Sequence, residues 1–182
     1  MNSIILAGGC FWGLQKFFDQ FENEGIKTET GYVNGNSSRT SYQQVCAGSG
    51  HAEAVKIEYP DTIKLPQILA AYFAAVDPTS KNRQGNDEGI NYRTGIYVTS
   101  EKDKQIANEM LFDLQKHYAK PIQIEVRDLM NYCPAEEYHQ KYLDKNPLGY
   151  CHLPKPLLVG HRLPTMEEVE QEYPDLTKSV SE

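Results

Sequence analysis

The chain has 182 residues and a formal net charge of −7, with 18 Lys and Arg against 25 Asp and Glu. This length fits a single domain, and the acidic balance argues against a nucleic-acid binder or a protein that docks on anionic membranes. No stretch approaches the roughly 20 apolar residues of a membrane span. The N-terminus lacks a signal-peptide pattern, so we expect a cytoplasmic protein with its cysteines as thiols.

Hydrophobic periodicity predicts, in chain order, a strand at 3–7, a helix at 13–23, strands at 26–33 and 55–59, a helix at 66–76, a strand at 94–99, a helix at 101–119, a strand at 121–127 and a short helix at 135–143. We expect loops at 34–50 and 80–92, because both are rich in polar residues and glycine. Residues 152–182 are expected to form a long C-terminal coil after a core at about 3–151. The order predicts a single-domain α+β fold: a ferredoxin-like two-layer sandwich with helices on a mainly antiparallel sheet.

The 4 cysteines stand at positions 10, 46, 133 and 151, with no C-x-x-C pair. They are too few for a disulfide scaffold and too widely spread for a standard zinc site. Cys151 and its neighbour His152 could combine with His161 as metal ligands, but that spacing fits no standard zinc pattern either. We therefore expect no metal site.

Cys10 lies in the sequence GGCFWG, residues 8–13, between the first predicted strand and the first predicted helix. The glycines permit a tight turn. The free N–H groups and dipole of a helix N-terminus favour an anion, so we expect a lowered pKa for Cys10 and a reactive thiolate. The alternative is an inert buried cysteine between two aromatic core residues, Phe11 and Trp12.

Two polar stretches run from the predicted loops into strands, and each supplies a carboxylate and a tyrosine. The residues of interest are Tyr42, Glu53, Asp87 and Tyr92. A carboxyl group near apolar rings can have a raised pKa and act as a general acid, and tyrosine hydroxyls can donate hydrogen bonds to a polarised oxygen. The alternative is that these side chains face water. His51 could be the base of a Cys/His hydrolase, although a structural histidine is the simpler interpretation.

Four ordered motifs, GCFWG, GHAE, QGNDxGxxYR and NPxGYC, resemble those of the A-type peptide methionine sulfoxide reductases, from about Leu6 to Cys151. The resemblance implies an enzyme that repairs oxidative damage by reducing the S epimer of methionine sulfoxide, free or in oxidised proteins. It implies no cofactor, thioredoxin as reductant and partner, and we expect a monomer.

The resemblance also implies a role for each motif residue. Cys10 would attack the sulfoxide sulfur, Phe11 and Trp12 would hold the S-methyl group, and Glu53 would protonate the sulfoxide oxygen. Cys151 would then convert the sulfenic acid on Cys10 into a disulfide that thioredoxin reduces.

Around the substrate, the resemblance implies that Tyr42 and Tyr92 hydrogen-bond to the sulfoxide oxygen and that Asp87 holds the substrate and a water molecule. Many family members carry a further recycling cysteine near the C-terminus, and none follows Cys151 here. We interpret Cys46 and Cys133 as structural, with a part in recycling as the alternative. A module that binds methionine-like ligands without turnover is the alternative function.

Overall fold

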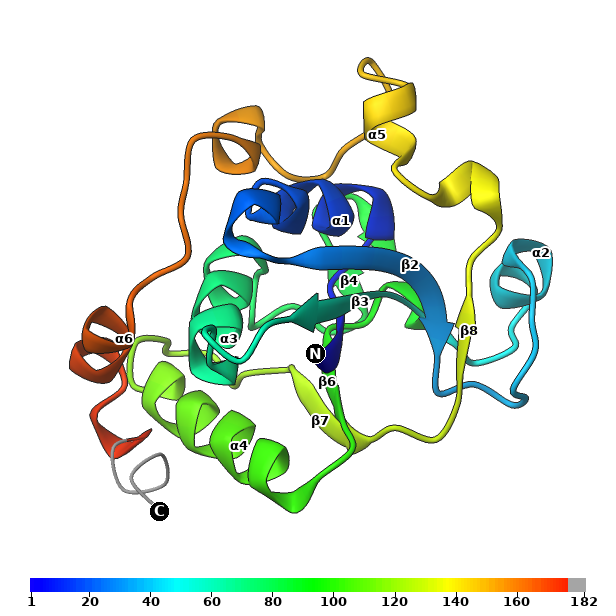
Figure 1. Ribbon diagram of the computed structural model, residues 1–182. Coiled ribbons are helices and arrows are strands. Elements are labelled where there is room, and N and C mark those ends of the chain that lie inside the picture. The colour runs from blue at the N-terminus through cyan, green and yellow to red at the C-terminus, as the bar shows by residue number, and fades with distance from the viewer. Residues whose placement is uncertain (177–182) are drawn as a thin grey trace.

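The computed structural model describes residues 1–176, so the end of the expected C-terminal coil, 177–182, lies outside the described residues. Its centre is a six-stranded sheet of order β7-β6-β1-β3-β2-β8 (Figure 1). The strands are β1 (Asn2–Ala7), β2 (Lys27–Val33), β3 (Ala52–Tyr59), β6 (Gly95–Val98), β7 (Glu125–Asp128) and β8 (Tyr132–Pro134). Only β6 and β7 pair in parallel, and the other neighbours in this sheet are antiparallel. The predicted α+β class with a mostly antiparallel sheet is confirmed.

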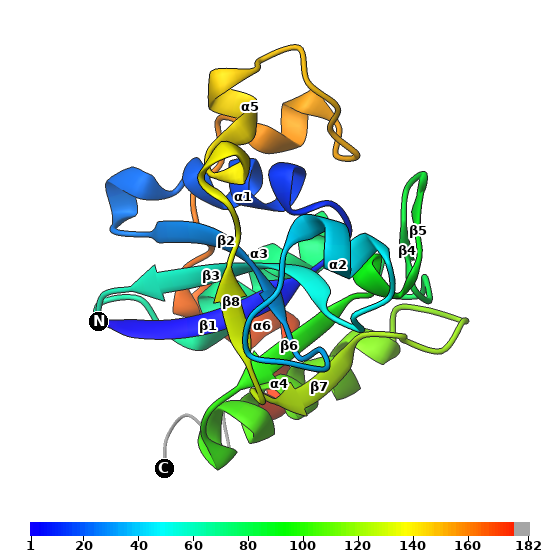
Figure 2. The same cartoon turned by 90° about the vertical axis from the view of Figure 1, so that its right-hand side faces the viewer.

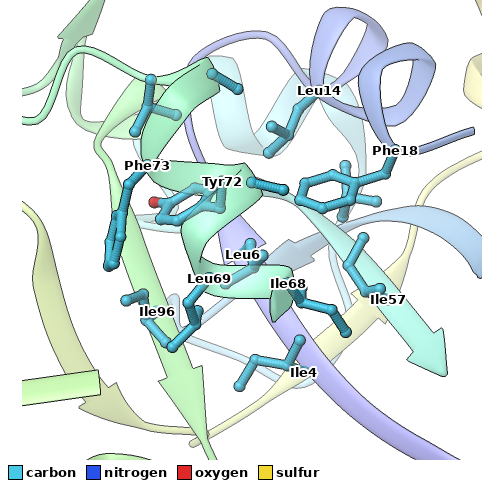
Figure 3. Packing of buried hydrophobic residues seen from close by; sticks show 14 of the residues in the cluster. Ile4, Leu6, Leu14, Phe18, Ile57, Ile68, Leu69, Tyr72, Phe73 and Ile96 are labelled. Carbon is cyan, nitrogen blue, oxygen red and sulfur yellow. The ribbon is translucent and has the colours of Figure 1, made fainter. Parts of the chain in front are cut away.

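The helices α1 (Phe11–Asp19), α3 (Leu65–Ala75) and α4 (Glu101–Gln115) bury their apolar sides in one core with the sheet. Figure 3 shows the side chains of α3 between those of α1 and those of the strands. Successive strand residues point to opposite faces of a sheet. Ile4 and Leu6 of β1 therefore join this main core, while Ile5 and Ala7 belong to a smaller cluster on the other face, with Tyr132 of β8 packed against it.

Tyr72 of α3 ties the helical layer to the end of the sheet that leads into Cys10. Its buried hydroxyl donates to the backbone carbonyls of Ala7, at 2.5 Å, and of Gly95, at 3.2 Å. These carbonyls belong to the last residue of β1 and the first residue of β6, which are paired. The hydroxyl thereby fixes the position from which the chain turns into α1.

Short polar elements account for most differences from the predicted secondary structure. The predicted loop at 34–50 contains α2 (Tyr42–Cys46), whose N-cap is Ser41. The loop at 80–92 contains a hairpin of β4 (Arg83–Gln84) and β5 (Asp87–Glu88), which Figure 2 shows together with α2. These elements are too short to produce a hydrophobic period.

The helix predicted at 135–143 is divided into a 3₁₀ turn, Glu137–His139, and α5 (Tyr142–Lys145), because Lys141 between them adopts a left-handed conformation. The strand β8 was not predicted, because it has only three residues and the last of them is Pro134.

The predicted C-terminal coil is only partly a coil. It contains a 3₁₀ turn at Lys155–Leu158, the helix α6 (Met166–Glu172) and a second 3₁₀ turn at Pro174–Leu176. A capping box between Thr165 and Glu168 begins α6, and the buried Val169 and Tyr173 join the main core. In Figure 1 this segment runs from α5 past α1 to the side of α3 and α4. Across residues 1–176, no helix is long and apolar enough to cross a membrane.

Candidate active site

Cys10 is the N-cap residue of α1, on the turn that follows β1. Gly9 makes this turn possible because its φ is +79°, and a β-carbon there would lie 2.6 Å from the β-carbon of Gln84. The Cys10 side chain is consequently enclosed, and the residue is only 7% exposed. α1 therefore begins at Phe11, two residues earlier than the periodicity predicts.

The predicted lowering of the Cys10 pKa is wrong for the protein without substrate. Burial raises the pKa of the Cys10 thiol well above its ordinary value, and the charge of Glu53 raises it further. The helix start does act in the expected direction, through the backbone N–H of Trp12, but this hydrogen bond is outweighed. Cys10 is thus a thiol at neutral pH in the resting protein.

Glu53 lies on β3 and is 1% exposed. Its Oε1 accepts a hydrogen bond of 3.2 Å from the backbone N–H of Phe11, in the first turn of the helix that Cys10 caps. Burial raises the pKa of Glu53 to about 8, opposed by the Phe11 N–H and assisted by the charge of Asp87. At neutral pH the carboxyl group is therefore mostly protonated and can give a proton to a bound molecule.

Two tyrosines lie around this carboxyl group. Tyr42 is the first residue of α2, and Tyr92 ends the 3₁₀ turn Ile90–Tyr92. Burial raises the pKa of Tyr42 to about 12 and raises that of Tyr92 as well, and the charges of Glu53 and Cys10 add to both shifts. Both hydroxyls therefore keep their protons and act as hydrogen-bond donors.

Asp87 and Cys151 come to the same place from distant parts of the chain. Asp87 lies on β5, and its charge raises the pKa of Cys10, Glu53 and Tyr92. Cys151 is half-buried, and a β-carbon built on Gly13 would lie 3.1 Å from its Sγ. Cys151 therefore lies against the first turn of α1, and burial raises the pKa of its thiol.

Phe11 and Trp12 form an aromatic wall with two residues that the sequence motifs did not single out. The indole Nε1 of Trp12 donates to Nδ1 of His139 at 2.9 Å, and the Trp12 ring stacks on Tyr142 with 3.7 Å between centroids. Burial lowers the pKa of His139, so the imidazole is a neutral acceptor. The His139 ring also lies 5.0 Å from that of Phe11. His139 and Tyr142 both lie in the sequence AEEYHQKYL, residues 135–143, from which we predicted a short helix but no site residue.

Glu136 lies in the same stretch, residues 135–143, and was not predicted as a site residue. Its carboxylate accepts from the backbone N–H of Tyr42 at 3.1 Å and from the hydroxyl of Tyr32 at 2.8 Å. Because Tyr42 begins a helix of only five residues, this contact fixes the position of α2 relative to β2.

His51 is not placed to act as a base for Cys10. Its Nε2 donates to the carbonyl of Ser37, its Nδ1 accepts from the hydroxyl of Ser49, and each contact is 2.8 Å. With both nitrogens engaged and the side chain buried, His51 is structural. The Cys/His hydrolase alternative is therefore wrong. His161, which was considered as a metal ligand, donates a hydrogen bond from Nε2 to the carbonyl of Pro156.

The remaining cysteines lie outside the closest group around Cys10. Cys46 is exposed on α2, one helical turn from Tyr42, and Cys133 is half-buried on β8 with its Sγ 3.7 Å from the Thr40 carbonyl. All 4 cysteines are free thiols.

Comparison with known proteins gives consistent matches over most of the chain. A family model described as peptide methionine sulfoxide reductase matches residues 2–168. The peptide methionine sulfoxide reductase MsrA of Clostridium acetobutylicum is 50% identical over 163 residues, covering 88% of this chain and 100% of that protein. The MsrA of Mycoplasma genitalium is 50% identical over 156 residues, covering 84% and 98% of the two chains.

Solved structures show the same fold. Reduced Mxr1 from Saccharomyces cerevisiae superposes with a TM-score of 0.79 at 34% identity, covering 90% of this chain and 92% of that one. Methionine sulfoxide reductase A of Corynebacterium diphtheriae gives a TM-score of 0.69 at 32% identity, covering 82% and 76%. Mxr1 is also known in complex with Trx2, and that chain shares the fold at 22% identity, with a TM-score of 0.56 over 78% of this chain and 84% of that one.

Proposed function

The chain belongs to the peptide methionine sulfoxide reductase family and is an oxidoreductase that reduces methionine sulfoxide; from this premise we propose that it acts on the S epimer, free and in proteins, through a sulfenic acid on Cys10. One observation carries the proposal. The carboxyl group of Glu53 is mostly protonated at neutral pH, and it accepts a hydrogen bond from the first turn of α1, the helix whose N-cap residue is Cys10.

The first step needs both groups. The substrate sulfur carries a partial positive charge, but its oxygen leaves poorly unless it is protonated. Glu53 gives a proton to this oxygen while Cys10 sulfur attacks the substrate sulfur, and the hydroxyls of Tyr42 and Tyr92 stabilise the developing charge. The substrate S–O bond then breaks, and the hydroxide released attacks the Cys10 sulfur as its bond to the substrate sulfur breaks. Methionine is released, Cys10 becomes a sulfenic acid, and the proton lost by the Cys10 thiol restores Glu53. The substrate sulfur is reduced and the Cys10 sulfur is oxidised.

The asymmetry of the site accounts for choice of the S epimer. Its apolar side consists of Phe11 and Trp12, and its polar side holds Glu53 and the tyrosines. In the R epimer, the methyl group and the oxygen exchange places. The oxygen would then face aromatic rings, and the buried O–H of the Glu53 carboxyl would have no acceptor in the substrate, which costs more than a misplaced methyl group.

For recycling, we propose that the Cys151 thiol attacks the sulfenic acid on Cys10, forming a disulfide and releasing water. The position of Cys151 against Gly13, one turn from Cys10, supports this step. Thioredoxin is the proposed reductant of the disulfide, and no cofactor is required. The yeast relative Mxr1, which shares the fold, forms a complex with Trx2.

We infer that the core is ferredoxin-like and that the described chain is one domain. The strand order β6-β1-β3-β2, with α1 after β1 and α3 after β3, supports the first inference. The contacts of α6 with α3 support the second, because they join the C-terminal segment to the main core.

The test is a count of methionine released from excess racemic sulfoxide without a reductant. The wild type should release about one methionine per enzyme, or about two if Cys10 returns to the sulfenic state after the disulfide forms. Cys10→Ser should release none, while the control Cys133→Ser should match the wild type. Release from the R epimer, or by Cys10→Ser, would refute the assignment. Binding of sulfoxide without any product would instead support the binding-module alternative.

Recycling needs a separate experiment. Cys151→Ser should complete one turnover and then stop in the presence of thioredoxin, with sulfenic acid accumulating on Cys10. Full thioredoxin-dependent activity of this variant would show that Cys46 or Cys133 resolves the sulfenic acid instead.

A further inference from the structure

His152 follows Cys151 directly and is enclosed beside the turn that holds Cys10. Its side chain is only 2% exposed. Within the described residues, neither Nδ1 nor Nε2 makes a hydrogen bond of standard length and angle. Buried polar atoms without partners are rare in folded proteins, so such a side chain calls for an explanation.

The imidazole lies against Gly9 and Gly13, on either side of Cys10 in the chain, and Gly13 also contacts the sulfur of Cys151. A β-carbon built on Gly9 would lie 3.1 Å from Nε2 of His152. A β-carbon built on Gly13 would lie 3.0 Å from Nδ1 of His152 and 3.1 Å from Sγ of Cys151. Nδ1 of His152 and Sγ of Cys151 therefore both lie next to Gly13 of α1.

A carboxylate stands on the same side of the ring. Oδ2 of Asp87 is 3.9 Å from Nδ1 of His152 and is itself buried without a hydrogen-bond partner. The titratable groups around the imidazole are Asp87 from β5, Tyr150 and Cys151 from its own segment, and Cys10 from the turn before α1, with Tyr150 hydrogen-bonded to Asp87. Burial lowers the pKa of His152, while the charge of Asp87 and the backbone of Gly8, which lies close enough to interact with the ring, oppose the shift. The ring is therefore neutral in the protein and gains an ion pair with Asp87 if it accepts a proton.

We propose that His152 accepts the proton of the Cys151 thiol when Cys151 attacks the sulfenic acid on Cys10, and that Asp87 stabilises the imidazolium formed. The proposal rests on the proposed function, in which Cys151 resolves the sulfenic acid. Because burial keeps Cys151 protonated, and the thiolate is the attacking species, a nearby proton acceptor speeds this step.

The atoms and electrons of the step balance. The Cys151 S–H bond breaks and its proton passes to His152. The S–S bond forms as the S–O bond of the Cys10 sulfenic acid breaks, so the Cys151 sulfur is oxidised and the Cys10 sulfur is reduced. The departing hydroxide takes up one proton and leaves as water, after which His152 is neutral again.

The experiment is a single turnover with methionine sulfoxide, in which methionine release and disulfide formation are followed separately by quenching and mass spectrometry. His152→Gln should release methionine at the wild-type rate but form the Cys10–Cys151 disulfide about tenfold or more slowly at pH 7. The slowing should shrink as pH rises, because Cys151 then ionises without assistance. The control His117→Gln removes an exposed histidine just after the end of α4 and should match the wild type.

A merely structural role would give a different result. If His152 only packs the segment, His152→Gln would slow the disulfide step equally at every pH, and an unchanged rate would also overturn the proposal. His152→Asn, which is smaller, should show the same pH-dependent slowing, so a folding defect in one variant does not decide the matter. Failure of the proposed function itself is distinguishable, since the wild type would then form no Cys10–Cys151 disulfide at all.

Discussion

Replacing Glu53 with glutamine should stabilise the protein while removing its proton donor. Burial raises the pKa of Glu53 in the folded protein to about 8, against 4.5 in the ordinary state. Between these values the unfolded chain has lost its proton and the folded protein keeps it, so unfolding becomes easier as pH rises. The resulting loss of unfolding free energy is absent below the lower pKa and grows by about 1.4 kcal/mol per pH unit between the two pKa values. At pH 7 it reaches about 3 kcal/mol.

The assay is urea unfolding of the wild type and Glu53→Gln at several pH values from 5 to 8. Glutamine keeps an oxygen that can accept from the Phe11 N–H but never ionises. The stability advantage of Glu53→Gln should therefore increase by about 3 kcal/mol over this range. Glu58→Gln, a half-exposed position on the same strand, should show no such increase. A constant difference between Glu53→Gln and the wild type would refute the assigned protonation state.

The activity of the same variant should move in the opposite direction. Glutamine cannot supply a proton to the sulfoxide oxygen, so methionine formation by Glu53→Gln should fall by about 10²- to 10⁴-fold. In the wild type, methionine formation should decline above pH 8 as Glu53 ionises. Equal single-turnover rates for the two proteins would contradict the role of Glu53.

Three further predictions concern the surroundings of the site. Gly13→Ala should leave the first methionine release unchanged but slow disulfide formation, because the new methyl group would press on the Cys151 sulfur; single-turnover mass spectrometry checks this, and an unchanged disulfide rate would contradict it. Tyr72→Phe should destabilise the fold by about 1–3 kcal/mol in urea unfolding, since the buried hydroxyl that bonds to the Ala7 and Gly95 carbonyls is lost. Cys46→Ser and Cys133→Ser should each keep thioredoxin-dependent turnover within about twofold of the wild type, and a loss in either would reopen the question of which cysteine takes part in recycling.

The elements with a clear hydrophobic period were predictable, and those formed by polar contacts were not. The alternation of β1 and β3 and the apolar side of α3 arise from burial, which leaves a periodic pattern in the sequence. The short α2 instead depends on Ser41 at its N-cap and on Glu136, which is distant in the chain. Similarly, β8 exists because it pairs with β2, and no local pattern in three residues indicates such a pairing.

At the candidate site, the motif residues could be predicted from the sequence, but the residues that support them through hydrogen bonds could not. The structure brings Cys10 together with Glu53 and Cys151, three residues to which the resemblance assigns the chemistry. The bond between Trp12 and His139 was not predictable, because it joins side chains 127 positions apart. A hydrogen-bond partner of this kind follows from the fold and not from a local pattern.

The pKa of Cys10 is raised, whereas its position at a helix N-terminus predicted a lowered value. A helix N-terminus favours a thiolate only where burial does not outweigh it, and here Cys10 is 7% exposed and beside Glu53. The thiolate is the form that peroxides and other oxidants attack. A resting thiol therefore protects Cys10 from oxidation that repairs nothing. In the proposed mechanism, a bound sulfoxide takes the proton of Glu53 at its oxygen and the electrons of Cys10 at its sulfur. Burial acts on both groups in the same direction, because it raises the pKa of the Cys10 thiol and the pKa of the Glu53 carboxyl and so favours the protonated form of each at neutral pH.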